Sequence, residues 1–150
     1  MITIIVTTDF SKSARVAYTI AKTIAEKMDA RIELIHVLNP NIMPPVYYQQ
    51  LAVSTELGEV RLNLQKKLKK ELNEYFSNYK NSGCHVLEGL PFKEIIQYAQ
   101  KIEAFFIVMA SHGHSAMNQL LFGSTVDKVV RKSSIPVLSV RDSDIHFELS

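Results

Sequence analysis

Short runs of β-branched residues alternate along this chain with longer segments whose apolar residues recur three or four positions apart. Strands are predicted at residues 2–7, 31–37, 84–88, 105–109 and 135–140. Helices are predicted at residues 11–28 and 56–79, and two more begin at Pro91 and near Ser124. Parallel strands need crossover connections, and right-handed crossovers cover both faces of the sheet with helices. The alternation therefore predicts an α/β fold with a doubly wound, five-stranded parallel sheet.

The two long helices are each predicted to bury one face. The buried stripe of the first consists of Ala17, Ile20, Ala21, Ile24, Ala25 and Met28. The stripe of the second consists of Val60, Leu64, Leu68, Leu72 and Phe76. Its outer face is predicted to carry Lys66, Lys67, Lys69, Lys70, Glu71 and Glu74. Mixed charges of this kind are typical of a solvated helix face.

Length and charge indicate one domain over residues 1–150, with a polar tail at 141–150. Its 17 basic and 15 acidic residues give a net charge of +2, which does not favour nucleic-acid binding. The single cysteine, Cys84, indicates a reducing compartment, so a cytoplasmic location is expected. The longest apolar stretch, residues 104–110, is far shorter than the roughly 18 residues that cross a bilayer. No membrane association is therefore expected.

A ligand site is predicted where the winding of the sheet reverses, at the carboxyl ends of the first and fourth strands. Residues 7–9 follow the first strand, and residues 110–115 follow the fourth. The second loop leads to residues 123–125 at a predicted helix N-terminus, whose N–H groups and dipole favour an anion. The chain has no G-K-[ST] sequence, so a phosphate would be held without a Walker lysine. From these residues alone, a phosphate-bearing ligand and a plain structural turn are equally open.

These loops carry motifs that resemble the universal stress protein family. The motifs are Thr8-Asp9-Phe10-Ser11, His36-Val37, Ser111-His112-Gly113-His114-Ser115 and Gly123-Ser124. The resemblance spans nearly the whole chain, and nucleotide-binding members of the family show the pattern G-x2-G-x9-G-[ST]. It implies a cytoplasmic, Rossmann-like domain of the adenine nucleotide alpha hydrolase-like type, with strand order 3-2-1-4-5. It also implies a homodimer, which often binds ATP.

Carried over by position, the resemblance assigns a set of residues to bound ATP, with Mg²⁺ held through the phosphates. Thr7, Thr8, Asp9 and Val37 border the nucleoside. Ala110 and Gly113 lie along the ribose and phosphates, and Met109, His112 and His114 complete the surroundings of the ligand. Gly123, Ser124 and Thr125 hold the phosphates. No residue is assigned to catalysis or to a metal held by the protein alone.

Ala110 departs from the family pattern, because the first glycine of the motif stands at this position in nucleotide-binding members. Glycine at the end of a strand serves either a positive φ or the close approach of backbone to a ligand. In ordinary β geometry, an alanine there costs little. His114 and Ala116 also replace an arginine and a glycine that are frequent in the family.

Three functions are open on the sequence. The favoured one is an ATP-binding regulatory module of the stress response with at most slow ATP hydrolysis, because Asp9 is the one carboxylate predicted in the site. The second is a nucleotide-free module for protein interaction, which Ala110 favours. The third and weakest is a small serine hydrolase, because Gly113-His114-Ser115 resembles a nucleophile elbow with Asp127 and His146 downstream.

The last strand predicts self-association. Its apolar residues, Val137, Leu138 and Val140, lie on a strand at the edge of the predicted sheet. An exposed apolar edge is a liability that pairing with a second copy removes. A homodimer in which the last strand, from Pro136 to Val140, forms the interface is therefore expected. The sequence specifies no other protein partner.

Overall fold

The computed structural model describes residues 1–41, 57–79, 81–111 and 123–142. Its strands are β1 (Thr3–Thr7), β2 (Arg31–Leu38), β3 (Gly83–Glu88), β4 (Phe106–Ala110) and β5 (Val137–Val140). Its helices are α1 (Lys12–Met28), α3 (Leu57–Phe76), α4 (Pro91–Lys101) and α5 (Ser124–Lys132). All strand pairs are parallel, in the order β3-β2-β1-β4-β5. The predicted α/β fold and strand order are confirmed.

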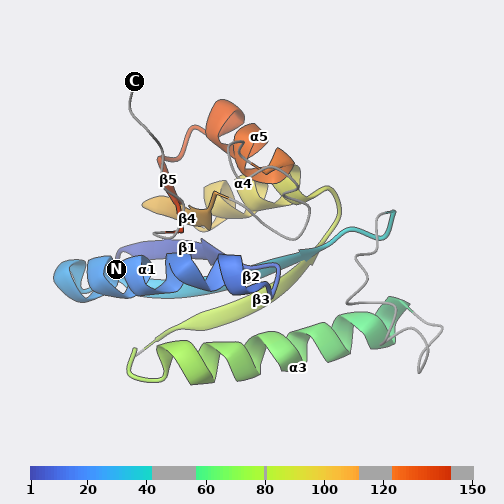
Figure 1. Ribbon diagram of the computed structural model, residues 1–150, viewed down its shortest axis with the longest axis horizontal. Helices are drawn as coiled ribbons and strands as arrows, with labels where there is room; N and C mark the ends of the chain where they lie inside the picture. Colours follow the sequence, from blue (N-terminus) through green and yellow to red (C-terminus); the bar gives the residue numbers. More distant parts are fainter. Residues whose placement is uncertain (42–56, 80, 112–122, 143–150) are drawn as a thin grey trace.

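The sheet separates two layers of helices, with α1 and α3 on one side and α4 and α5 on the other (Figure 1). Alternate residues of β1 face opposite layers. Ile4 and Val6 pack with α1 and α3, whereas Ile5 packs with α4 and α5. Side chains alternate in this way along any strand, so both faces of the sheet are buried. Among the described residues, no helix is both long and apolar enough to span a membrane.

Local chemistry fixes the ends of the helices where the sequence predicts them. The Ser11 hydroxyl accepts a hydrogen bond from the backbone N–H of Ala14 at 3.0 Å, which caps α1. Asp29 closes the same helix in the left-handed conformation, with φ of 49°. Pro91 opens α4 as its first residue. The strand limits differ from the predicted ones by one or two residues. β1, β4 and β5 begin later than predicted, at Thr3, Phe106 and Val137, whereas β3 begins one residue earlier and β2 and β4 end one residue later.

The buried face of α1 differs from the predicted one. Its buried residues are Ala14, Ala17, Tyr18, Ala21 and Ala25. Ile20 is 40% exposed, so the prediction that it belongs to the buried stripe is wrong. The physical reason is the large ring of Tyr18, which fills the space between α1 and α3. Its centroid lies 5.1 Å from that of the Phe76 ring. Burial of this ring turns Ile20 toward solvent.

Glu71 also differs from its predicted position on the outer face of α3, because it is 4% exposed. Its Oε1 accepts hydrogen bonds from Arg15 Nε at 2.8 Å and from the Tyr18 hydroxyl at 3.0 Å. A buried carboxylate is tolerated when it is paired and hydrogen-bonded in this way. Both partners lie on α1, so the local period of α3 gives no sign of the burial.

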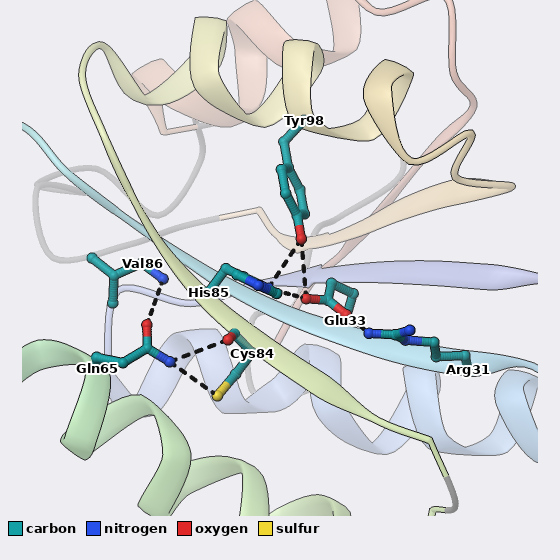
Figure 2. Close-up of polar contacts among 7 residues, drawn as sticks. All are labelled: Arg31, Glu33, Gln65, Cys84, His85, Val86 and Tyr98. Atoms are coloured by element: carbon teal, nitrogen blue, oxygen red, sulfur yellow. Dashed lines mark hydrogen bonds and ion pairs between the residues drawn. The ribbon is translucent and has the colours of Figure 1, made fainter.

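A second buried carboxylate, Glu33 of β2, holds the amino-terminal end of β3 in place (Figure 2). Arg31 Nη2 donates to it at 2.6 Å, and the Tyr98 hydroxyl of α4 donates at 3.1 Å. His85 of β3 contacts the same carboxylate through Nδ1. Gly83 passes so close that a β-carbon built there would lie 2.6 Å from Glu33 Oε2. This cluster joins three elements at the sheet end opposite the predicted site.

The outer edge of β3 is occupied by a side chain of α3 (Figure 2). Gln65 Nε2 donates to the carbonyl oxygen of Cys84 at 3.1 Å, and Gln65 Oε1 accepts from the N–H of Val86 at 3.0 Å. A residue of a neighbouring parallel strand would make the same two bonds around His85. The amide therefore takes the place of a further strand at this edge.

Candidate functional site

The pairing of β1 with its two neighbours ends at different points. β1 pairs with β2 as far as Thr7 and Ile35, and the N–H of Thr8 still donates to the Ile35 carbonyl at 2.9 Å. The register of β1 with β4 ends earlier, at Val6 and Val108. β4 continues beside β5 as far as Ala110. The carboxyl ends of β1 and β4 therefore separate, which is the arrangement that precedes a ligand site in doubly wound sheets.

The loop after β1 is held by hydrogen bonds to its own backbone. Thr8 Oγ1 accepts from the N–H of Phe10 at 3.0 Å, and Asp9 Oδ1 accepts from the N–H of Ser11 at 2.9 Å. His36 Nδ1 lies 2.7 Å from the carbonyl oxygen of Thr8, so β2 holds the same loop from the side. Thr8 is buried and Asp9 is half-buried. The loop therefore presents the Asp9 carboxyl group from a fixed backbone.

Phe10 adopts a conformation that bulky residues rarely adopt, with φ of 64°. Such backbone costs on the order of 1–3 kcal/mol and persists only where the surroundings enforce it. The ring centroid of Phe10 lies 4.6 Å from that of His36, and Lys67 Nζ of α3 lies 4.5 Å from the Phe10 centroid. Contacts with β2 and α3 thus hold the Phe10 ring in place. The strained backbone of Phe10 directly follows Asp9.

At the end of β4, the backbone of Ala110 is unstrained. Among the described residues, positive φ values outside glycine occur at Phe10, Asp29, Asn81 and Glu103. Ala110 is paired with Val140 in the sheet, and its side chain packs against the core layer on the α1 side. The alanine in place of the family glycine therefore causes no conformational strain here.

The amino terminus of α5 is tied to the same strand end. The N–H of Gly123 donates to the Ser111 carbonyl at 2.9 Å, and the first helical bond runs from Asp127 N–H to the Gly123 carbonyl at 3.0 Å. Gly123 stands at the N-cap position and has no side chain, so no side-chain cap bonds the first N–H groups of the helix. The N–H groups of Ser124 and Thr125 therefore have no acceptor within the helix, and the helix dipole favours an anion beside them.

The structure brings together most of the predicted residues it describes. We call the set at the carboxyl ends of β1, β2 and β4 and the start of α5 the strand-end site; it comprises Thr7, Thr8, Asp9, Val37, Ala110, Gly123, Ser124 and Thr125. Met109 is 4% exposed, and its side chain lies in the core layer of α4 and α5. The predicted residues His112, Gly113 and His114 lie outside the described residues, as do Ser115 and His146 of the hydrolase hypothesis.

Two residues that hold the loop after β1 were assigned no role in the predicted site. They are Phe10, whose N–H donates to Thr8 Oγ1, and His36, whose Nδ1 lies 2.7 Å from the Thr8 carbonyl oxygen. Both stand in the motifs that carry the family resemblance. Within the described ranges, no group of three or more His, Cys, Asp or Glu residues could hold a metal ion.

The fold and the strand-end site define the class of the protein: a doubly wound α/β domain of the adenine nucleotide alpha hydrolase-like type. The sequence profile of the universal stress protein family matches residues 1–141. A universal stress protein of Methanocaldococcus jannaschii is 31% identical over 140 residues, which cover 92% of this chain and 81% of the relative. The chain belongs to the universal stress protein family.

Solved structures share the fold over nearly the whole chain. A second Methanocaldococcus jannaschii universal stress protein superimposes with a TM-score of 0.72 and 27% identity, covering 95% of this chain and 96% of its own. A universal stress protein in complex with cAMP has a TM-score of 0.64 at 23% identity, with 93% and 95% covered. An Arabidopsis thaliana member with AMP bound has a TM-score of 0.59 at 16% identity, with 96% and 94% covered. These two members of the family thus bind the adenine nucleotides cAMP and AMP.

Proposed function

We propose that this protein binds an adenine nucleotide, ATP with Mg²⁺ held through the phosphates, at the strand-end site. The observation that carries the proposal is the early end of the β1–β4 register beside an α5 amino terminus that is anchored to Ser111 and not capped by a side chain. Backbone N–H groups at a helix start are suited to phosphate oxygens. The AMP and cAMP complexes of family members support adenine as the base.

The residues present fit such a ligand by their chemistry. Ser124 and Thr125 supply hydroxyl and N–H donors for phosphate at the start of α5, and Gly123 brings no side chain between them and β4. Asp9 supplies the carboxylate nearest to a nucleoside or a magnesium ion, and Val37 an apolar contact for the base. His112, Gly113 and His114 are proposed to complete the phosphate side. Any hydrolysis of ATP is expected to be slow, because no other carboxylate is assigned to the site.

Calorimetric titration with Mg-ATP tests the proposal. The protein is first purified without added nucleotide, and acid-released small molecules are identified by chromatography, because a retained nucleotide would mask the titration. Binding with one nucleotide per chain is expected. A protein that carries no nucleotide and gives neither heat nor a thermal shift at millimolar Mg-ATP would favour the nucleotide-free interaction module instead.

Restoring the family glycine at Ala110 is expected to change nucleotide affinity little. Since the alanine has an ordinary φ and its methyl packs toward α1, Ala110→Gly should alter the Kd for Mg-ATP by less than about threefold. The same substitution should lower the free energy of unfolding by roughly 0.5–1 kcal/mol, because glycine weakens a strand. Titration and thermal melts of both proteins measure the two effects. A gain in affinity of tenfold or more would show that the methyl group obstructs the ligand.

We also propose that the protein acts as a cytoplasmic homodimer joined through β5, in a regulatory module of the stress response. Of the two sheet edges in the described chain, β3 is occupied by Gln65, whereas β5 pairs with β4 alone. Leu138 of β5 is 37% exposed, and Ser139 and Val140 are half-buried beside it. Pairing of β5 with its copy would complete the hydrogen bonds of this edge and cover Leu138.

A charge on β5 is expected to dissociate the dimer. Leu138→Lys places an ammonium group where the second copy would lie, and edge lysines oppose strand pairing. Sedimentation velocity should show a dimer for the natural sequence and a dissociation constant raised at least roughly tenfold for the variant. Leu62→Lys is the matched control, since Leu62 is 62% exposed on α3 and remote from β5. Equal dimerisation of all three proteins would contradict an interface at β5.

A further inference from the structure

The hydrogen-bond ladder between β1 and β2 ends on a side chain. The N–H of Thr8 donates to the Ile35 carbonyl at 2.9 Å, one residue beyond the last paired residues of the two strands. If the parallel ladder continued, the Thr8 carbonyl would accept from the N–H two residues after Ile35, which is that of Val37. The Thr8 carbonyl oxygen instead lies 2.7 Å from Nδ1 of His36. The His36 imidazole thus takes the place of the next ladder bond.

The acceptor fixes the proton on the His36 ring. A carbonyl oxygen only accepts hydrogen bonds, so Nδ1 carries the proton of this bond, and a neutral ring is held in the Nδ1–H tautomer. His36 is 4% exposed, so the bond is shielded from water. The same ring lies against the Phe10 ring, with the centroids 4.6 Å apart and the planes tilted by 43°. His36 therefore contacts the turn after β1 twice, at a backbone oxygen and at an aromatic ring.

The turn that follows depends on where the ladder ends. Thr8 Oγ1 accepts from the N–H of Phe10 at 3.0 Å, and Asp9 Oδ1 accepts from the N–H of Ser11 at 2.9 Å. Side-chain bonds to a backbone N–H two residues later form in turns and not in extended strands. The backbone of Phe10, with its φ of 64°, also needs neighbouring contacts to enforce it. A ladder that ran one residue further would therefore move Asp9 from its present place.

We propose that His36 is a positioning residue of the strand-end site, whose Nδ1–H ends the β1–β2 ladder at Thr8 and so sets the turn that carries Asp9. The inference rests on the proposed nucleotide binding and deepens it. Asp9 and Val37 are both assigned to the nucleoside, and His36 precedes Val37, so it fixes the position of one relative to the other. A turn that is ordered before the ligand arrives loses less conformational entropy on binding, which increases affinity. His36 is assigned no contact with the ligand and acts through the turn.

Two substitutions of His36 separate the hydrogen bond from the ring. His36→Asn keeps a nitrogen donor close to the position of Nδ1 and removes most of the ring. His36→Phe keeps an aromatic ring against Phe10 and removes the donor. Tyr98→Phe is the matched control, because the Tyr98 hydroxyl donates at 3.1 Å to Glu33, which lies on the same strand and on the opposite face of the sheet. It also removes one hydrogen bond to a side chain of β2.

Two readouts are measured on the natural protein and the variants: amide hydrogen exchange at Phe10 and Ser11 without nucleotide, and the Kd for Mg-ATP by calorimetry. His36→Phe should accelerate both exchange rates about tenfold and weaken Mg-ATP binding roughly tenfold. His36→Asn should stay within about threefold of the natural protein, and Tyr98→Phe within about twofold. If His36→Phe does not fold, His36→Gln replaces it, because its amide lies one methylene further out and should lose the affinity that His36→Asn keeps.

Failure of this inference can be told from failure of the proposed function. If the natural protein does not bind Mg-ATP, nucleotide binding is refuted, and exchange at Phe10 and Ser11 still decides the role of His36. If the natural protein binds Mg-ATP and the variant without the donor matches His36→Asn in exchange and affinity, the positioning role is overturned while nucleotide binding stands. Equal losses in that variant and in Tyr98→Phe would also overturn it, because they would show a general loss of stability.

Discussion

Replacement of Ser124 by glutamate is expected to abolish Mg-ATP binding while the fold is kept or slightly stabilised. Ser124 is the exposed first residue of α5, where the phosphates are proposed to lie. Like charges about 4 Å apart repel by about 4 kcal/mol at an effective dielectric constant near 20, so a loss of affinity of at least roughly 100-fold is expected. An acidic residue at a helix start stabilises the helix by about 0.3–1 kcal/mol, so the melting temperature should not fall.

Ser134→Glu provides the matched control for this prediction. Ser134 is exposed just beyond the other end of α5, and the substitution changes the net charge by the same amount. Calorimetry should give this variant the affinity of the natural protein. If Ser124→Glu still bound Mg-ATP with an unchanged Kd, the phosphates would not lie at the start of α5.

Gly83→Ala is expected to destabilise the protein by about 3 kcal/mol, because overpacking and the loss of a buried ion pair each cost on this order. The new β-carbon would lie 2.6 Å from Glu33 Oε2 and 2.7 Å from Arg31 Nη2. The Glu33 carboxylate would have to move away from its donors Arg31 and Tyr98, although it is 1% exposed. Thermal unfolding should show a fall in Tm of roughly 6–12 °C for a chain of this length.

Gly58→Ala, at the start of α3, is expected not to destabilise the protein, in contrast to Gly83→Ala. Among the described residues, no atom outside its chain neighbours and its own helix backbone lies within 4 Å of the position that its β-carbon would take. Alanine has a higher helix propensity than glycine, so the melting temperature should stay equal or rise slightly. If both alanine variants melted at the temperature of the natural protein, the close packing of Gly83 against the Glu33 cluster would not contribute to stability.

The architecture could be predicted because its signals are local. The β-branched run before Thr8 and the apolar run before Ala110 identify strands, and Ser11 and Pro91 mark helix starts with their own side chains. The alternation of strand and helix then restricts the topology to a few winding orders. The first and last residues of the strands were less predictable. β5 begins at Val137 because pairing with β4 starts there, and no residue of β5 itself marks that point.

The polar interior could not be predicted, because its pairs join residues distant in sequence. Glu33 is 65 residues from Tyr98, and Glu71 is 56 residues from Arg15. On α3, Glu71 has the sequence context of a solvated charge, with Lys70 before it and Glu74 one turn later. Only the packing of α1 against α3 shows that it is buried. The same packing turns Ile20 outward and Tyr18 inward.

The location of the candidate site could be predicted from the topology of the sheet. The backbone geometry of the residues around it could not. The winding reversal of the predicted sheet points to Asp9 and Ala110 from the order of the strands alone. The left-handed φ of Phe10 has no signature in its residue type, because a bulky aromatic is disfavoured in that region. The geometry at Ala110 was open on the sequence, and the structure gives it ordinary strand backbone.

The most direct test of the central claim is amide hydrogen exchange of the natural protein with and without Mg-ATP. Nucleotide binding at the strand-end site predicts added protection in three separate segments: residues 7–10 from the end of β1, residues 110–111 from the end of β4, and residues 123–126 at the start of α5. Protection confined to another surface, or no change at saturating Mg-ATP, would contradict nucleotide binding at the strand-end site.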